Sequence, residues 1–264
     1  MVTQARARER AAAPATEAVV EVRDLHKRFD GKEVLRGVSF DVDRGETLVV
    51  MGGSGSGKTV MLRHVAGLIR PTRGTIKVFG QRIESLSEEE LLPIRRRMGY
   101  VFQGAALFDS LTVYENVAYP LREHSSLGEA KIHERVVHFL SLVGLGPEIL
   151  DVLPAELSGG MRKRVGIARA LIGEPEMLLF DEPTAGLDPT NAKMVGELIV
   201  KLRGGVCDTA VVVTHDLELA KTVADRVAIL IDGRFAALGP LDAVLGSTEP
   251  AVQAFMAGDA RVTA

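Results

Sequence analysis

The chain has 264 residues, of which 46% are hydrophobic and 25% are charged, and its net charge is −3. This length suits one large domain or a domain with an inserted lobe, and the charge balance gives no global attraction to nucleic acid or anionic lipid. The single cysteine excludes an internal disulfide, and no apolar run reaches the roughly 18 residues that a membrane-spanning helix requires.

The N-terminal stretch "MVTQARARERAAAPATEA" is basic and alanine-rich and lacks the apolar core of a secretory signal. We expect a disordered tail over residues 1–18. From Val19 onward, "VVEVRDL", "VSFDV" and "TLVVM" alternate or run apolar, and the turn sequences "FDGK" and "DRGE" separate them. This pattern predicts three strands, of which the first two pair in antiparallel fashion.

A glycine-rich sequence, "GGSGSGKT", follows the third strand. It fits the phosphate-loop pattern G-x-x-x-x-G-K-[ST], in which backbone N–H groups surround phosphate oxygens at a helix N-terminus. In that pattern the lysine reaches the β and γ phosphates and the threonine hydroxyl binds Mg²⁺. A flexible glycine turn is the alternative, but it does not account for the strand, the helix and the Lys-Thr pair together. The predicted nucleotide-binding residues here are Gly52, Gly53, Ser54, Gly55, Ser56, Gly57, Lys58 and Thr59.

The following helix, "KTVMLRHVAGLI", places Met61, Val65 and Leu68 on one stripe and is expected to stop at Pro71. Two more strands, "TIKVF" and "MGYVF", come next. From about residue 104 to about residue 173 strand-like runs vanish and helical spacing takes over, which predicts an inserted helical lobe.

Strands return as "MLLFD", "AVVVT" and "VAILI", with the helical sequences "PTNAKMVGELIVKL" and "DLELAKTVADR" between them. The first two are continuous apolar runs, as expected of parallel strands that are covered on both faces. The expected fold is an α/β P-loop nucleotidase core with a mostly parallel sheet, an N-terminal antiparallel β subdomain and an inserted α-helical lobe. This domain is expected over residues 19–246, with a short C-terminal tail over residues 247–264.

Polar side chains follow three of the apolar strands: Asp181 and Glu182 after "MLLF", Gln103 after "MGYVF", and His215 after "AVVVT". Ligands of α/β sheets gather at the carboxyl ends of the strands. Asp181 is the predicted magnesium ligand, and Glu182 is suited to be a general base or to orient water. An acidic turn and structural Gln and His residues are the alternative interpretation, which the phosphate loop makes less favourable.

A second glycine-rich helix start lies in "ELSGGMRKRVGIARA". A helix N-terminus with bare glycines could close the open face of a γ phosphate. The sequence "LSGGM", taken in order with Gly52–Thr59, Gln103, "MLLFDE", "AGLD" and His215, resembles the ATP-binding-cassette (ABC) ATPases from about Val19 to about Gly246. The basic residues Arg162–Arg164 are interpreted as a solvated helix face rather than a nucleic-acid site.

This resemblance implies that two copies pack head to tail around two ATP molecules, each with Mg²⁺. The signature loop, Leu157–Met161, then serves the nucleotide of the other subunit, and Met161 departs from the Gln that is usual at the fifth position. The resemblance also implies further roles: adenine stacking for Phe29, nucleotide contact for Ser158, Gly159 and Gly160, the joint between lobes and a metal contact for Gln103, the subunit interface for Asp188, and the γ-phosphate switch for His215. The implied catalytic residues are Lys58, Glu182 and His215, and the implied metal ligands are Thr59, Gln103 and Asp181.

A narrower likeness joins "VFQGAALFDSLTVYENVAYPLREH" and the signature Met to the ATPases of Mla- and Mce-type phospholipid trafficking. It implies membrane permease and lipid-binding partners, a peripheral position on the cytoplasmic face of the inner membrane, and no nucleic-acid partner. The segment around Ala105–Tyr119 is the expected docking site for the permease. Other ABC importers or exporters, a soluble ABC protein acting on DNA or ribosomes, and a non-catalytic regulatory cassette stay open as alternatives.

Overall fold

The structure is a computed structural model that describes residues 17–258, so the predicted tail of residues 1–18 lies outside the described residues except for Glu17 and Ala18. An antiparallel sheet with the strand order β2-β1-β4-β5 forms at the N-terminal side. Its strands are β1 (Ala18–Phe29), β2 (Lys32–Asp43), β4 (Arg73–Val78) and β5 (Gln81–Arg82). β1 pairs with β2 in antiparallel fashion, as the sequence predicts.

A second sheet has the strand order β10-β9-β3-β8-β7-β6 and carries the phosphate loop at the end of one strand. Its strands are β3 (Thr47–Met51), β6 (Met98–Val101), β7 (Met177–Asp181), β8 (Thr209–Thr214), β9 (Arg226–Ile231) and β10 (Arg234–Pro240). All neighbours in this sheet are parallel except the β9–β10 pair. The carboxyl ends of β3, β6, β7 and β8 therefore lie along one edge, where the predicted site residues follow.

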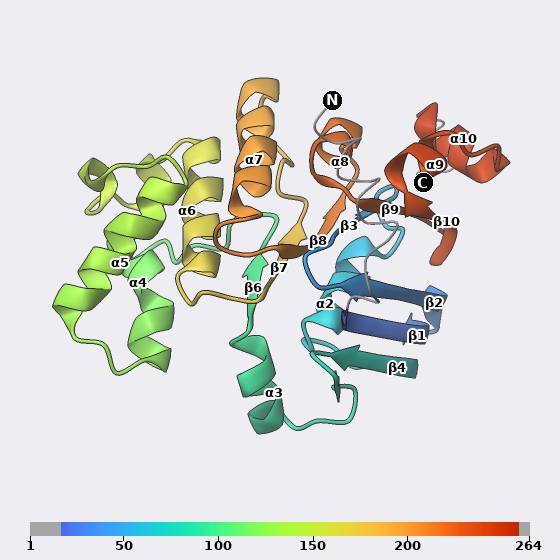
Figure 1. Cartoon of the computed structure of the whole chain (residues 1–264), viewed down its shortest axis with the longest axis horizontal. Coiled ribbons are helices and arrows are strands. Elements are labelled where there is room, and N and C mark those ends of the chain that lie inside the picture. The colour runs from blue at the N-terminus through green and yellow to red at the C-terminus, as the bar shows by residue number, and fades with distance from the viewer. Residues whose placement is uncertain (1–16, 259–264) are drawn as a thin grey trace.

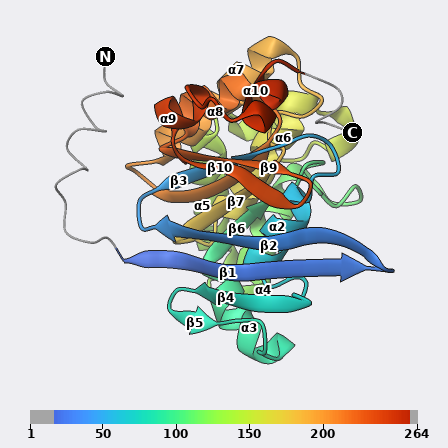
Figure 2. The same cartoon turned by 90° about the vertical axis from the view of Figure 1, so that its right-hand side faces the viewer.

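The helices cover both faces of this sheet. They are α2 (Lys58–Val65), α3 (Glu88–Arg95), α4 (Val113–His124), α5 (Glu129–Leu142), α6 (Gly159–Leu171), α7 (Pro189–Leu202), α8 (Leu217–Val223), α9 (Leu241–Leu245) and α10 (Pro250–Met256), with the short 3₁₀ turns η1 (Pro147–Ile149) and η2 (Pro154–Glu156). Helices α4, α5 and α6 lie between β6 and β7 in sequence and form a lobe on the opposite side of the molecule from the antiparallel sheet (Figure 1). Figure 2 shows β2, β1 and β4 lying below β9 and β10 as a separate layer.

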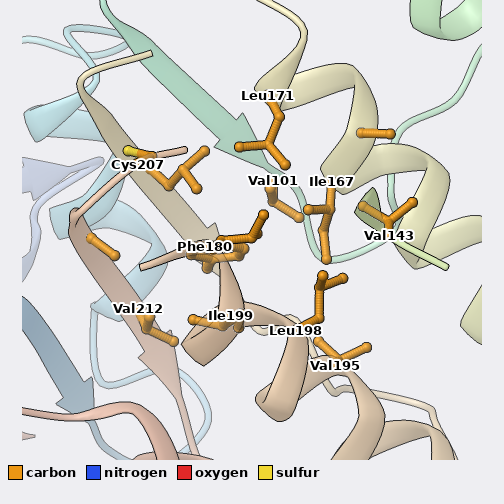
Figure 3. Packing of buried hydrophobic residues seen from close by; sticks show 14 of the residues in the cluster. Val101, Val143, Ile167, Leu171, Phe180, Val195, Leu198, Ile199, Cys207 and Val212 are labelled. Carbon is orange, nitrogen blue, oxygen red and sulfur yellow. The ribbon is translucent and has the colours of Figure 1, made fainter. Parts of the chain in front are cut away.

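Two hydrophobic cores hold the layers together. Alternate residues of β3 enter different cores: Val49 and Met51 pack on the side of the helical lobe, whereas Leu48 and Val50 pack toward the antiparallel sheet. In the first core Phe180 of β7 is fully buried between Val212 of the sheet and the helices α6 and α7 (Figure 3). Burial on both faces explains the continuous apolar runs of the parallel strands.

Helix α2 is shorter than the sequence suggests. It ends at Val65, and Gly67 adopts a left-handed conformation with φ of +66°, which interrupts the helix before Pro71 is reached. Leu68 is consequently 46% exposed instead of continuing the buried stripe of Met61 and Val65. The predicted role of Leu68 in this stripe was therefore wrong.

No helix within residues 17–258 combines the length and the apolar character that crossing a bilayer requires.

One histidine is completely buried between the two sheets. His64 of α2 is 0% exposed, its Nδ1 donates to the Val60 carbonyl at 2.7 Å, and its Nε2 has no hydrogen-bond partner among the described residues. Burial disfavours the charged ring and lowers the pKa of His64 from its ordinary 6.5 to about 4. A second proton on the ring would place a positive charge on a fully buried side chain.

This burial predicts a stability that depends on pH. Between about pH 6.5 and 4 the unfolded chain binds the His64 proton and the folded chain does not, so the free energy of unfolding should fall as the pH falls. The maximum slope for one such group is about 1.4 kcal/mol per pH unit. The free energy of unfolding should be measured in urea at pH 7 and at pH 5. Between these two pH values it should fall by about 1–2 kcal/mol more in the native protein than in His64→Leu.

The exposed His124 provides the control, because His124→Leu should keep the pH dependence of the native protein. Identical pH dependence in the native protein and His64→Leu would show that His64 is not buried in its neutral form.

Candidate functional site

A cleft of about 610 Å³ opens at the carboxyl edge of the parallel strands. This volume lies within the range of about 300–1,000 Å³ that is typical of small-molecule sites. The lining residues come from the phosphate loop, from the ends of β6, β7 and β8, and from the C-terminal helix: Met51, Gly53, Ser54, Gly55, Lys58, Thr59, Gln103, Glu182, His215, Leu217, Phe255, Met256 and Gly258. The fold thus brings together four of the predicted elements at one place.

At its last glycine, the phosphate loop has a backbone conformation that only glycine adopts readily. Gly57 has φ of +107°, and a Cβ there would lie 2.9 Å from Leu35 Cδ2. The chain then enters α2 directly at Lys58. The Lys58 ammonium donates to the carbonyls of Gly52 and Gly53 at 2.8 and 3.0 Å, which holds it inside the loop.

Lys58 also forms an ion pair with Glu182. Its Nζ lies 3.3 Å from Glu182 Oε1, and the two side chains are only 7% and 10% exposed. The other oxygen, Oε2, accepts from Nδ1 of His215 at 2.9 Å and from the backbone N–H of His215 at 3.3 Å. The Glu182 carboxylate is therefore held between a cation and an imidazole, so Lys58, Glu182 and His215 meet at one point.

Glu182 has an unusual backbone that directs its side chain into the cleft. Its φ is +48°, a left-handed conformation that is uncommon for a residue other than glycine. Its N–H donates to the Val213 carbonyl at 2.9 Å, and its own carbonyl accepts from the Ala185 N–H at 3.2 Å. Asp181, the last residue of β7, continues the strand, and this change of direction separates the two adjacent carboxylates.

Asp181 accepts a hydrogen bond on each carboxylate oxygen. Thr59 Oγ1 donates to Oδ1 at 2.8 Å, and the Tyr100 hydroxyl donates to Oδ2 at 3.3 Å. Burial and the neighbouring Asp181 raise the pKa of Tyr100, so its hydroxyl remains a donor at neutral pH. Sequence reasoning missed Tyr100, although a hydroxyl inside the apolar strand "MGYVF" was a visible signal.

The oxygen atoms around Asp181 suit magnesium. The part of the chain that the structure describes has no cluster of three or more His, Cys, Asp and Glu side chains that could hold a metal ion. Mg²⁺ in nucleotide sites is bound by one or two carboxylates together with phosphates and water, so one carboxylate beside a threonine hydroxyl fits this chemistry. Thr59, Asp181 and the amide of Gln103, which also lines the cleft, are the residues that could hold it.

Lys163 is the second residue that sequence reasoning missed. It is only 5% exposed, and its ammonium donates to the backbone carbonyls of Gln103 and Glu182, the latter at 3.1 Å. The expectation of a solvated face for Arg162–Arg164 was therefore wrong at Lys163. The signal was present, since Lys163 precedes Ile167 by four residues and Leu171 by eight, which places it on the buried stripe of α6.

The second glycine-rich helix start lies away from the cleft residues. Ser158 caps α6 by accepting from the Met161 N–H at 3.2 Å. A Cβ on Gly160 would lie 2.4 Å from Asn191 Oδ1, so the loop packs closely against the start of α7. Asp188 caps that helix through the N–H groups of Thr190 and Asn191, and the Asn191 amide lowers the pKa of Asp188. The structure thus places Ser158, Gly159, Gly160 and Asp188 in one group, none of which lines the cleft.

Phe29 and the C-terminal helix lie at different distances from the cleft lining. Phe29 is 42% exposed at the end of β1, where Lys27 Nζ lies 4.7 Å from its ring centroid, and it is not among the residues that line the cleft, so its predicted contact with adenine stays a prediction. Within the predicted tail of residues 247–264, helix α10 buries Val252 and contributes Phe255 and Met256 to the cleft wall. The sequence pattern gave no sign of this contribution.

Residues 35–185 match the ABC transporter family. The probable ribonucleotide transport ATP-binding protein mkl of Mycobacterium leprae is 41% identical over 239 residues, which are 90% of this chain and 69% of that protein. The chain therefore spans about two thirds of the length of that relative. The intermembrane phospholipid transport system ATP-binding protein MlaF of Escherichia coli K12 is 38% identical over 240 residues, which are 91% of this chain and 89% of that protein.

Among solved structures, a dimeric ATP-binding cassette in a post-hydrolysis state with bound ADP and Pi is 33% identical. The match covers 84% of this chain and 98% of that chain, with a TM-score of 0.78. The predicted fold class is confirmed by this likeness and by the two sheets and the helical lobe of the structure.

Proposed function

This chain belongs to the ABC transporter family of ATPases, and we propose that it powers the movement of phospholipid between membranes as the ATP-hydrolysing subunit of a transporter. The observation that carries the lipid assignment is the match to MlaF, which extends over 91% of this chain and 89% of that protein. The name of the mycobacterial relative supports a second candidate, ribonucleotide transport, but that protein is longer than the region it shares with this chain.

The phosphate loop and Lys58 bind the phosphates of ATP in this proposal. Lys58 is fixed by two loop carbonyls and paired with Glu182, so its charge is already oriented toward the cleft. Bound Mg²⁺ would neutralise charge on the β and γ phosphates. Thr59, Asp181 and Gln103 are the residues that would hold it, and Tyr100 keeps the Asp181 carboxylate in place through its hydroxyl.

Hydrolysis requires a water molecule in line with the γ phosphate. Glu182 accepts the proton of this water while the new P–O bond forms and the bond to ADP breaks. The left-handed backbone of Glu182 and its contacts with Lys58 and His215 hold the carboxylate in the cleft rather than beside Asp181. Because Nδ1 of His215 donates to Glu182, a contact from Nε2 to a γ-phosphate oxygen requires a proton on Nε2 as well, so that the ring donates from both nitrogens.

Each nucleotide is proposed to contact two copies of the chain. Ser158, Gly159 and Gly160 do not line the cleft of their own chain, yet they form an open helix N-terminus that suits an anion. A head-to-tail dimer places this group over the γ phosphate of the partner, with Asp188 at the interface and Phe29 beside the adenine. The dimeric cassette with ADP and Pi supports this arrangement.

An exposed aromatic pair forms the proposed docking site for a membrane permease. Phe108 and Tyr119 are 45% and 42% exposed, and their ring centroids are 5.1 Å apart. The fully buried Asn116 fastens the backbone of this loop, since its side chain bonds to both the N–H and the carbonyl of Phe108. Leu107 instead packs against the core, so the docking surface within the predicted segment is the aromatic pair. In this proposal the permease holds the subunit on the cytoplasmic face of the inner membrane.

The first test separates the base from the metal ligand. Glu182→Gln keeps the shape of the side chain and removes the negative charge, so the affinity for ATP should stay within about threefold while kcat falls by about 100-fold or more. Size-exclusion chromatography with ATP and Mg²⁺ should show more dimer than for the native chain. Asp181→Asn should instead raise the Mg²⁺ concentration needed for half-maximal activity. Glu197→Gln, at an exposed carboxylate of α7, is the control, and a native rate for Glu182→Gln in the assembled transporter would reject this role.

The docking test uses Phe108→Asp. The side chain is exposed and its backbone is fixed by Asn116, so the fold and the melting temperature should remain while co-purification with the permease is lost. Leu92→Asp places the same charge on an exposed apolar residue of α3 and should leave the complex intact. Unfolding of Phe108→Asp, or an intact complex, would contradict a docking role.

The substrate test uses the complete transporter purified with its native partners. Mass spectrometry of bound small molecules should find phospholipid, and ATP hydrolysis in phospholipid vesicles should exceed that in detergent without lipid. Co-purifying nucleotides other than ATP and ADP, together with stimulation of hydrolysis by ribonucleotides and not by phospholipid, would favour the second candidate.

A further inference from the structure

Helix α6 carries an ammonium group that binds the backbone of two residues that line the cleft of its own chain. The Nζ atom of Lys163 donates to the backbone carbonyls of Gln103 and Glu182, which belong to the loops after β6 and β7. An ammonium group has three N–H donors and no acceptor, so one atom can join two carbonyls from separate strands. Lys163 thereby fixes the backbone of the two cleft residues that follow those strands.

The Glu182 carbonyl is a sensitive place for such a contact. Glu182 adopts a left-handed φ of +48°, which costs energy for a residue with a side chain and persists only when its surroundings impose it. The carbonyl accepts from Lys163 Nζ at 3.1 Å and from the Ala185 N–H at 3.2 Å. Loss of the ammonium would release one of these two restraints and allow the carboxylate to move.

Gln103 is held in a loop of similar character. Ala105 and Ala106 that follow it both have positive φ, +63° and +48°. Helix α6 fixes this loop at two more points, because Arg169 donates to the Ala105 carbonyl at 2.9 Å and a Cβ on Gly166 would lie 3.1 Å from Ala105 Cβ. Of these contacts between α6 and the loop, the one made by Lys163 is to Gln103, which lines the cleft.

Helix α6 itself is a firm support for Lys163. A Cβ on Gly99 of β6 would lie 2.5 Å from the Ala170 carbonyl, so the helix and the strand pack with their backbones in close contact. Lys163 is 5% exposed, and burial lowers the pKa of its ammonium while the nearby Asp181 and Glu182 oppose that shift. A buried ammonium paired only with neutral carbonyls is costly unless nearby carboxylates offset the burial.

We propose that Lys163 is a positioning residue for hydrolysis, which holds Glu182 and Gln103 of its own chain in their working geometry and does not touch the nucleotide. This inference rests on the proposed role of Glu182 as the base. It differs from a role in the signature loop, because Ser158 at the start of the same helix acts on the partner's nucleotide. A defect at Lys163 should therefore appear in the site of the chain that carries it.

The test uses mixed dimers in the assembled transporter, with the two ATPase chains tagged differently and the mixed complex isolated. In one arrangement Lys163→Met is in the chain with the functional phosphate loop, and the partner carries Lys58→Ala. In the other arrangement Lys163→Met and Lys58→Ala are in the same chain, and the partner is native. The first arrangement tests the variant at its own site, and the second tests it through the signature loop. A dimer of one native chain and one Lys58→Ala chain is the reference for both.

In the first arrangement kcat should fall by about 10- to 100-fold, because a displacement of about 1 Å at a reacting group has effects of this order. The affinity for ATP should change less than about threefold. In the second arrangement kcat should stay within about twofold of the reference. Lys163→Gln keeps an uncharged donor and should give a kcat between those of Lys163→Met and the native chain.

Arg164→Met is the matched control. Arg164 is also a cation of α6 that donates to backbone carbonyls, but these carbonyls belong to Val143 and Gly144 within the helical lobe. It should keep the native kcat and report any general loosening of α6 through its melting temperature. If Lys163→Met does not fold, Lys163→Gln carries the same comparison.

An unchanged kcat in the first arrangement, or an equal loss in both arrangements, would overturn the proposal. The result for Glu182→Gln separates this failure from a failure of the proposed base: a slow Glu182→Gln beside an active Lys163→Met would reject only the role of Lys163.

Discussion

The buried ion pair between Lys58 and Glu182 is the contact on which the site depends. Lys58 begins the helix after the phosphate loop and Glu182 follows a strand on the other side of β8, so their meeting requires the parallel order of the sheet. Removal of either partner would leave the other as an unpaired charge with no more than about a tenth of its side chain exposed. The pair therefore forms only when β3, β8 and β7 pack in this order, and it orients the two groups to which we assign roles in ATP hydrolysis.

Two layers of support surround this pair. Nearest are the groups that bind its members directly: the carbonyls of Gly52 and Gly53 on Lys58, and His215 on Glu182. Behind them, Tyr100 and Thr59 hold Asp181, and Lys163 holds the backbone of Glu182. The second layer comes from β6, from α2 and from α6 of the inserted lobe, and α6 is also the helix that begins at the signature loop. The first glycine-rich helix start lines the cleft of its own chain and the second does not, which leaves the second for the proposed contact with the partner's nucleotide.

Sequence patterns predicted most of the fold because its strands are buried on both faces and its loops carry specific chemistry. The runs "TLVVM" and "MLLFD" predict buried parallel strands, because a phosphate loop follows the first and two carboxylates follow the second. Prediction from local sequence failed where contacts with distant parts of the chain determine the structure. Helix α2 ends early because Gly67 takes a left-handed conformation, and the buried Lys163 donates hydrogen bonds to two carbonyls in the loops after β6 and β7. The contribution of Phe255 to the cleft depends on a helix that returns from the end of the described chain, and no short motif indicates that return.

We infer that the two glycine-rich helix starts of one chain serve two different nucleotides. The most direct measurement is a high-resolution structure of the Glu182→Gln chain with ATP and Mg²⁺ under conditions that favour the dimer. The account predicts that each γ phosphate is bound by Lys58 of one chain and by Ser158 Oγ and the Gly160 N–H of the other, at hydrogen-bond distances of about 3 Å. A structure in which one chain provides all contacts to its triphosphate, with the signature loops facing solvent, would contradict it.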